Sequence, residues 1–395
     1  MDIEKLRSET STFSRGITYL DHAAGSVPPF PVIESMKKYL KDLAEKGPVH
    51  PRLYDESMKK VSETKQKLAK FINAKGEEEI AFVKTGSEAI SILADGLKLR
   101  KDDEVIVDAL EITPGFVPWL RLKKETGIKV KILKIDKDGL LNVNELQELV
   151  TPKTKLILAL HISNLLGTLQ PVEQIGRIAK ENQALYVVNA CESLGQLEVD
   201  IQKLKCDFIF APFRKWLRGP QGLALLFCRK ELINKIEPAS IGWNTTRWVS
   251  DEGYAHMNTC ERFEAGEPNF LAVAGLSRAV DYVSEAGGLQ AIRARIKKLT
   301  RYLLEKLDAV KGLEIYGIKD ENLRGGIVSF NLKKVAPRKV SEKLAEKNVV
   351  IEAGTFAARL ALSTFGLKEC ARVCVHYFND ETDIDRFVEN LKNVK

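Results

Sequence analysis

Short apolar runs alternate with longer amphipathic segments through the first two thirds of this 395-residue chain. In the segment between two such runs, Ile175, Ile178 and Ala179 recur at helical spacing. Strands that alternate with helices are typical of an α/β fold with a mostly parallel sheet between helices. Seven runs have the character of buried strands: 79–83, 104–107, 129–133, 155–160, 184–188, 208–210 and 223–227.

The pattern changes after about Gly266. Two long helical patterns come first, and short strand signals then alternate with helices, which predicts a smaller C-terminal α+β domain. The helices are expected at 270–286, 290–310, 338–347 and 381–392, and the strands at 313–316, 326–332 and 372–377. We therefore divide the chain into an N-terminal arm (1–25), a large α/β domain (26–265), and a linking helix with the small domain (266–395).

Composition narrows the class of protein. Hydrophobic residues make up 44% and charged residues 29%, which is typical of a soluble globular protein. The net charge of +7 is dispersed, and no basic block with interleaved aromatics suggests a nucleic-acid partner. No run reaches membrane-spanning length, and the N-terminus lacks a signal-peptide core, so we expect a cytoplasmic protein. The six cysteines show no CxxC pair, and we expect free thiols and no metal site.

Lys215 is the first candidate for chemistry. It follows the apolar run 208–210 and precedes the glycine-containing turn 219–222. A lysine just past a buried strand can be desolvated, which lowers its pKa and makes the amine nucleophilic, as Schiff-base chemistry requires. The alternative is a solvated loop lysine.

Polar segments also follow three other predicted strands. Ligands of open parallel sheets bind beyond the carboxyl ends of the strands, so these segments should meet at one edge. Gly86 and Ser87 open a predicted helix and offer a phosphate site, although Ser87 could equally be an ordinary N-cap. Asn164 could donate to a ligand oxygen or stabilise its own turn. Asn189 and Glu192 follow the run 184–188.

In this order the motifs resemble those of the class V aminotransferase family, which belongs to the fold-type I enzymes that depend on pyridoxal phosphate (PLP). The family includes cysteine desulfurases and isopenicillin N epimerase-like proteins, and the resemblance covers nearly the whole chain. The segments that carry it are 19–24, 85–90, 112–119, 161–168, 214–222, 263–269 and 372–379. It implies the fold-type I architecture and a homodimer in which the segment 263–269 reaches the partner's active site.

The resemblance also assigns roles to individual residues. Lys215 would hold PLP as an internal aldimine and then move the proton at the substrate Cα. Arg372 would bind a substrate carboxylate through its planar fork, with Ala24 of the N-terminal motif beside the substrate; the alternative for Arg372 is a surface-facing strand residue. The remaining cofactor contacts would be Gly86, Ser87 and Arg214 at the phosphate and Asn164 near the phenolic oxygen.

Several positions depart from the family pattern. Asn189 stands where an aspartate usually keeps the pyridine nitrogen protonated, so we expect a weaker electron sink. Ile112 replaces a ring-stacking histidine, and Glu192 replaces a glutamine near the phenolic oxygen. Glu267 stands where a phosphate-binding threonine from the partner is common. The loop 352–359 has no cysteine, which argues against sulfur transfer through a persulfide on that loop.

Three hypotheses follow. The first is a PLP enzyme acting at Cα of an amino acid, most like the epimerase-like branch, with transamination, racemisation and elimination all open. The second is a diverged scaffold or binding protein that no longer uses PLP. The third is a cysteine desulfurase-like enzyme that lacks the loop cysteine.

Overall fold

The structure is a computed structural model that describes residues 1–394, and its centre is a seven-stranded sheet in the order β2-β8-β7-β6-β5-β3-β4. The strands are β2 (Ile80–Val83), β3 (Glu104–Asp108), β4 (Lys129–Leu133), β5 (Thr154–Leu160), β6 (Leu185–Asn189), β7 (Phe208–Pro212) and β8 (Ala224–Cys228). Neighbours from β7 to β4 are parallel, and β8 is antiparallel to both β7 and β2. The α/β fold class with a mostly parallel seven-stranded sheet is thus confirmed, with each strand end within two residues of its prediction.

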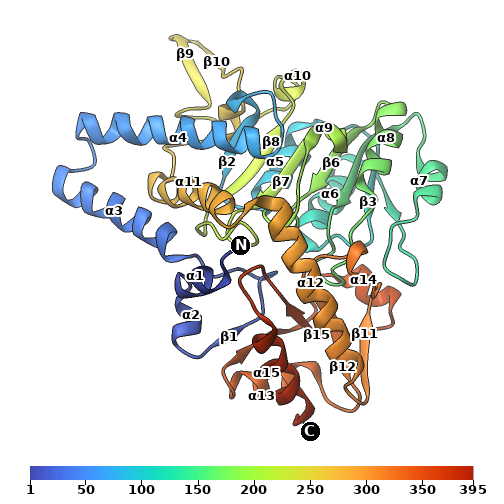
Figure 1. Ribbon diagram of the computed structural model, residues 1–395. Helices are drawn as coiled ribbons and strands as arrows, with labels where there is room; N and C mark the ends of the chain where they lie inside the picture. Colours follow the sequence, from blue (N-terminus) through green and yellow to red (C-terminus); the bar gives the residue numbers. More distant parts are fainter. Residues whose placement is uncertain (395) are drawn as a thin grey trace.

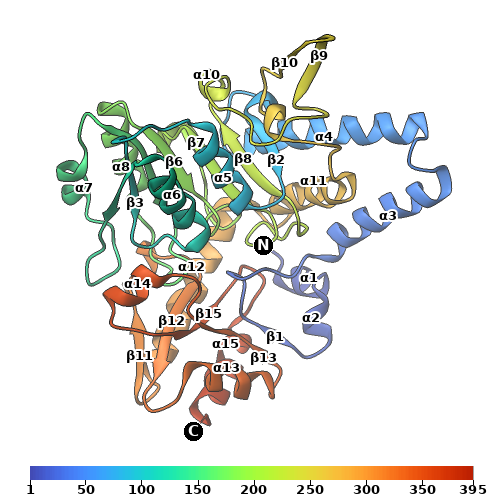
Figure 2. The ribbon, with the colours of Figure 1, turned by 180° about the vertical axis from the view of Figure 1, so that it is seen from behind.

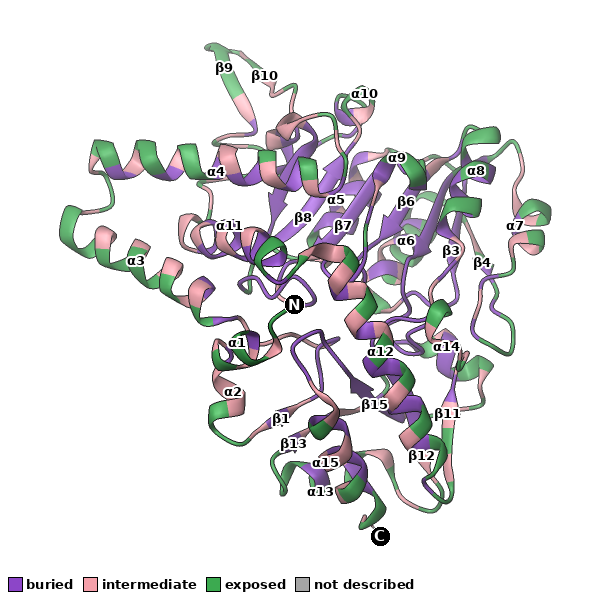
Figure 3. Cartoon of the chain, viewed as in Figure 1, coloured by how far each residue is buried: buried purple, intermediate pink, exposed green. Residues whose placement is uncertain are grey.

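Helices cover both faces of the sheet (Figures 1 and 2). One core contains strand residues with the apolar sides of α4 (Pro51–Phe71), α8 (Val172–Glu181) and α11 (Phe270–Glu285). The opposite core contains α5 (Gly86–Gly96) and α6 (Thr113–Thr126). Apart from the partly exposed edge strand β4, the strands are buried from both sides, which explains why they read as continuous apolar runs (Figure 3). Shorter helical segments complete the large domain: η1 (Glu77–Glu79), α7 (Val143–Leu149), α9 (Ile201–Leu204), α10 (Lys230–Ile233) and η2 (Cys260–Phe263).

Two features that our sequence reading did not anticipate project from the body. Helix α3 (Phe30–Lys46) and the outer part of α4 extend to one side, with exposed outer turns (Figures 1 and 3). Strands β9 (Thr246–Ser250) and β10 (Gly253–His256) form a separate antiparallel hairpin. Trp248 on this hairpin is 82% exposed. Val32 is the one buried residue of α3, and strands β9 and β10 have none, so apolar patterning alone signals these elements weakly.

The C-terminal region is built on a four-stranded antiparallel sheet in the order β11-β12-β15-β14, as the α+β prediction requires. Its strands are β11 (Leu313–Tyr316), β12 (Ile327–Leu332), β14 (Glu352–Gly354) and β15 (Cys370–Cys374). Helix α12 (Gly288–Asp308) runs from the large sheet to this region (Figure 1), and it packs with α15 (Glu381–Lys392) in a third core. The remaining helices are α13 (Pro337–Ala345), η3 (Glu321–Leu323) and α14 (Arg359–Thr364).

The last strand is shorter than the predicted 372–377. It ends at Cys374 because the chain turns at His376, where the Asn379 side chain accepts a hydrogen bond from the His376 amide at 2.8 Å. The N-terminal arm, with α1 (Ile3–Ser8) and α2 (Ser11–Ser14), lies against this region: β1 (Thr18–Tyr19) pairs in parallel with β13 (Val349–Val350). The domain boundaries at 25 and 265 stay a prediction.

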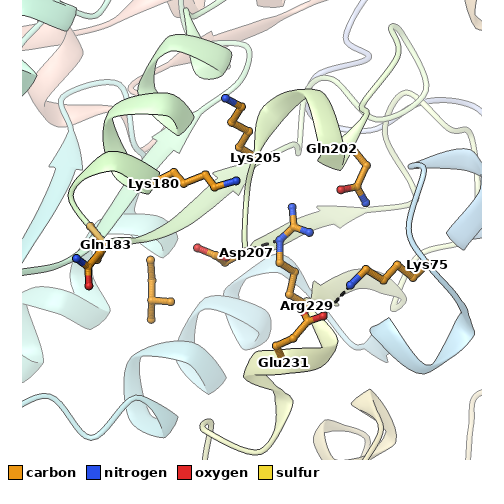
Figure 4. A pocket seen from close by; sticks show the side chains of 10 residues that line it. Lys75, Lys180, Gln183, Gln202, Lys205, Asp207, Arg229 and Glu231 are labelled. Carbon is orange, nitrogen blue, oxygen red and sulfur yellow. Dashed lines mark hydrogen bonds and ion pairs between the residues drawn. The ribbon is translucent and has the colours of Figure 1, made fainter.

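The two edges of the large sheet differ. The carboxyl ends of the parallel strands lead into the segments that carry Asn164, Asn189 and Lys215. The opposite edge has a cavity of about 540 Å³ lined by charged residues such as Lys180 and Arg229 (Figure 4), and none of the predicted site residues lies in it. In the described chain, no helix is long and apolar enough to cross a bilayer. Residues 1–394 also contain no group of three acidic, histidine or cysteine side chains placed to hold a metal ion.

Candidate active site

Lys215 lies in the tight connection between β7 and β8 and is 9% exposed. The connection is held by backbone hydrogen bonds from the Arg218 amide to the Lys215 carbonyl at 3.0 Å and from the Gly219 amide to the Phe213 carbonyl at 2.8 Å. Gly195 packs against it from behind, since a Cβ there would lie 2.5 Å from the Trp216 carbonyl carbon. The lysine is therefore fixed at the sheet edge and is not a solvated loop residue.

The amine of Lys215 is paired with Glu192. Glu192 Oε1 contacts Lys215 Nζ, and Glu192 Oε2 accepts a hydrogen bond from Trp216 Nε1 at 2.7 Å. The carboxylate has no exposed surface. A buried carboxylate requires such partners to remain charged. The two side chains that the sequence placed after different strands therefore form one buried ion pair.

Asn189 is the last residue of β6, and both polar atoms of its side-chain amide form hydrogen bonds. Its Oδ1 accepts from the Cys191 amide at 3.0 Å, and its Nδ2 donates to Glu111 Oε1 at 2.9 Å. Burial, and then the nearby Asp108, raise the pKa of Glu111 to about 8. Burial also raises the pKa of Asp108 to about 6, against hydrogen bonds from the Leu160 and Leu110 amides. Near neutral pH Glu111 is therefore mostly protonated, whereas Asp108 keeps its negative charge.

The start of α5 has free backbone N–H groups that suit an anion. Thr85 is the N-cap and accepts from the Glu88 amide at 3.1 Å, so Ser87 is free of the capping role considered for it. Gly86 and Ser87 are the first two residues of the helix, where backbone N–H groups have no acceptor within the helix. A Cβ at Gly86 would lie 3.2 Å from Phe210 and 3.6 Å from Cys191 Sγ, so glycine allows the close approach to the sheet edge. Helix starts of this kind bind phosphate.

Arg372, on β15, is enclosed rather than surface-facing. Its Nη2 donates to Asp21 Oδ1 at 3.0 Å and to Glu352 Oε2 at 2.6 Å, and its Nη1 donates to the Asn164 carbonyl at 3.0 Å. The Phe356 ring covers the guanidinium at 4.2 Å. Asn164 donates to the Phe356 carbonyl at 3.3 Å, while its buried Oδ1 has no partner within residues 1–394. Arg372 is therefore ordered by two carboxylates of the same chain.

The remaining predicted residues are Ala24, Arg214, Ile112 and Glu267. Arg214 Nη1 contacts the Ala24 carbonyl, which joins the N-terminal motif to the lysine segment. Ile112 is the half-buried N-cap of α6 and packs on the first core. Glu267 is exposed near the start of α11, on the side of Tyr39. Its expected role in a partner's site stays a prediction.

Some site residues were absent from our sequence-based set. Asp108 ends β3 and Glu111 follows it, and two acidic residues after the apolar run 104–107 were a usable signal. Glu352 begins β14, in the segment singled out from the sequence only for its missing cysteine. Trp216 showed no signal of its own, because only the fold reveals that its indole N–H points at Glu192.

The residues present fit PLP. A buried lysine, the open start of α5, and the unpaired amide oxygen of Asn164 supply an amine, an anion site and a polar contact. The Asn189 amide has one N–H left after its bond to Glu111, and such a donor suits an unprotonated ring nitrogen. PLP would be held by Lys215, Gly86, Ser87, Arg214, Asn164 and Asn189, and it would supply an electron sink for a carbon bonded to the substrate's amine.

Comparison with known proteins gives a consistent picture. A model of the family described as "Aminotransferase class-V" matches residues 18–387. A "Probable cysteine desulfurase" of Methanothermobacter thermautotrophicus is 35% identical over 385 residues, which is 96% of this chain and 95% of that protein. A protein of Pyrococcus abyssi with the same description is 32% identical, over 96% of this chain and 94% of its own length.

Solved structures agree in fold. The apo structure of a cysteine desulfurase from Thermococcus onnurineus has a TM-score of 0.93 at 31% identity, covering 99% of this chain and 97% of that one. A cysteine desulfurase from Escherichia coli has a TM-score of 0.92, covering 100% of this chain and 98% of that one. At 24% identity, this second likeness concerns the fold alone.

Proposed function

The chain belongs to the class V aminotransferase family, and we propose that it is a PLP-dependent enzyme that acts at Cα of an amino-acid substrate through Lys215. The observation that carries the proposal is the position of Lys215: buried, fixed between β7 and β8, and at the same sheet edge as the start of α5. A buried amine and an open helix start at one sheet edge are what a carbonyl cofactor with a phosphate needs.

Each residue of the site has a separate role in the proposed reaction. The amides of Gly86 and Ser87, with Arg214, bind and orient a phosphate. Lys215 forms the covalent link and then moves the proton at the substrate Cα. Asn189 contributes a neutral hydrogen bond, since its amide is held by Glu111 at 2.9 Å. Arg372 is the candidate anchor for the substrate carboxylate.

The reaction we favour is elimination at a sulfur-bearing amino acid, as in a carbon–sulfur lyase. Its support is that the curated relatives at 35% and 32% identity are described as probable cysteine desulfurases. The loop 352–359 has no cysteine to take up the sulfur, so in an elimination the sulfur would leave as sulfide or a thiol with the electron pair of the broken carbon–sulfur bond. An epimerase-like or aminotransferase reaction at Cα is the alternative within the same mechanism.

We further propose a homodimer that shares its active sites. Trp243, at 67% exposure, and the projecting hairpin with Trp248 present apolar surface that a second copy would cover. This surface is tied to the segment 263–269, because the Gly266 amide donates to the Trp243 carbonyl at 3.0 Å. The six free thiols support a reducing, cytoplasmic location.

Absorbance tests the proposal. The protein, incubated with PLP and freed of excess, should show a visible band that Lys215→Ala removes. Each of the common L- and D-amino acids is then added, and sulfide release, keto acid and exchange of the Cα proton for deuterium are measured. Sulfide from cysteine supports the lyase, exchange without keto acid indicates epimerisation, and keto acid without sulfide indicates transamination.

A PLP-free scaffold is the second candidate. It is favoured by one observation: Lys215 and Arg372 are both already paired with carboxylates of the chain. A protein that stays colourless with PLP at all pH values, and that binds no amino acid, would fit this candidate and exclude the enzyme.

A further inference from the structure

Glu192 is held in place at both carboxylate oxygens and at its backbone carbonyl. Its Oε2 accepts from Trp216 Nε1, its Oε1 contacts Lys215 Nζ, and its backbone carbonyl accepts from Gln196 Nε2. Trp216 is itself fully buried and stacks against His376, with ring centroids 5.0 Å apart. The carboxylate therefore cannot swing away from Lys215 without breaking a buried hydrogen bond.

A carboxylate at contact distance favours positive charge on its partner. Between buried groups such as these the effect is larger than at the surface. The other carboxylates do not compete for this role, since Asp21 and Glu352 bind Arg372 and Glu111 binds Asn189. Glu192 is thus the acidic group dedicated to the Lys215 nitrogen.

We propose that Glu192 is the counter-ion of the Lys215 nitrogen and keeps a positive charge on it, in the free amine and after Lys215 has bonded to PLP. The second half rests on the proposed function. A positive nitrogen draws electrons from the carbon to which it is double-bonded, so a substrate amine attacks that carbon more readily. Asn189 carries no charge, and the positive charge of the site would therefore be concentrated at the Lys215 end.

Other titratable groups surround the pair. They are Cys191 and Arg214 on the neighbouring loops, Glu111 after β3, and Arg372 and Cys374 on β15. Burial raises the pKa of both thiols to about 12, so they stay neutral during an assay near neutral pH. Both arginines stay charged. Glu111, with a pKa of about 8, is the group whose titration has to be separated from that of the pair.

The test is a pH titration of the visible absorbance of PLP-loaded protein, which reports protonation of the Lys215 nitrogen and not activity. Wild type is compared with Glu192→Gln, Glu192→Asp and Glu111→Gln. Loss of the carboxylate should lower the midpoint by about 1–3 pH units, the usual effect of removing an adjacent opposite charge. Glu192→Asp keeps the charge but withdraws it by one methylene, so its midpoint should lie between wild type and Glu192→Gln. Glu111→Gln should stay close to wild type.

The outcomes separate the two proposals. A Glu192→Gln midpoint at or above that of wild type overturns the counter-ion while leaving PLP binding intact. If Glu192→Gln does not fold, a Glu192→Asp midpoint equal to wild type overturns it in the same way. Absence of a visible band in wild type at every pH overturns the proposed function and, with it, the half of the proposal that concerns Lys215 bonded to PLP.

Discussion

Arg372 Nη2 donates a hydrogen bond to Glu352 Oε2 across 2.6 Å, so the predicted anchor for a substrate carboxylate already binds a carboxylate of its own chain. The two partners differ in exposure: the Arg372 side chain is buried, whereas that of Glu352 is 44% exposed. Glu352 can therefore leave at low cost, and Arg372 cannot. A substrate carboxylate would have to displace it.

Removing this competitor should tighten substrate binding. We expect Glu352→Gln to bind carboxylate-bearing substrates about tenfold more tightly, equivalent to ~1.4 kcal/mol. Spectral titration of the PLP-loaded protein with an amino acid measures it. Glu369→Gln, which breaks the ion pair with Arg338 in the same region, is the matched control and should have no effect. Weaker binding in Glu352→Gln would show that Glu352 helps to hold the substrate.

Gly195 should be needed for the position of Lys215. It has a φ of +103°, and an alanine Cβ would lie 2.5–2.6 Å from the backbone of Trp216 and Leu217. Gly195→Ala should therefore displace the lysine segment and weaken PLP retention, measured by absorbance after dialysis. Gly222→Ala is the control, since its φ is +74° but its Cβ would meet nothing within 4 Å. It should cost only about 1–2 kcal/mol of backbone strain and keep PLP. Equal loss of PLP from both variants would show that backbone strain alone causes the loss.

The buried pair of Lys65 and Glu264 should dominate the attachment of α4 to the sheet. Lys65 Nζ lies 2.8 Å from Glu264 Oε1, and this oxygen also accepts from the Phe82 amide at 2.7 Å. Lys65→Met leaves a buried carboxylate without its cation and should cost about 3–5 kcal/mol of unfolding free energy. Chemical denaturation measures it. Lys67 lies on the same helix as Lys65 and forms a partly exposed pair with Asp281 of α11. Lys67→Met should therefore cost less than about 1 kcal/mol.

Glu111 should make stability fall as pH rises. Its folded pKa of about 8 lies above the ordinary carboxyl value, so the folded chain binds more protons than the unfolded chain between about pH 4.5 and 8. The stabilisation that protonated Glu111 contributes is complete below about pH 4.5 and is lost as pH rises through 8. Unfolding free energy measured at pH 6 and pH 8.5 should therefore differ more in wild type than in Glu111→Gln. The control Glu148→Gln changes an exposed side chain and should keep the wild-type change in unfolding free energy between the two pH values. The same change in Glu111→Gln would show that another group causes the pH dependence.

Much of the fold could be predicted from the sequence because it depends on local patterns. Buried parallel strands read as apolar runs, and all seven strands of the large sheet were predicted. Lys215 and Asn189 could be placed at one edge because parallel strands end together. The hairpin with Trp248 was missed, since its apolar residues contact no core within the chain and leave no periodic signal.

The contacts of the site could not be predicted in the same way. Residues 192 and 215 were both singled out, but their ion pair depends on how two loops fold over the sheet edge. Arg372 lies 351 positions from Asp21 in the sequence, and no local pattern reports such a contact. Glu111 looked like an ordinary polar residue after a strand until the structure placed it against Asn189.

The most direct measurement of the central claim is mass spectrometry after borohydride reduction of the PLP-loaded protein. Reduction fixes any carbon–nitrogen double bond between PLP and an amine, so the labelled peptide identifies the residue. The account predicts a stoichiometric phosphopyridoxyl group on Lys215 and none on the exposed Lys84 near the start of α5. An unlabelled Lys215, or a label spread over surface lysines, would contradict it.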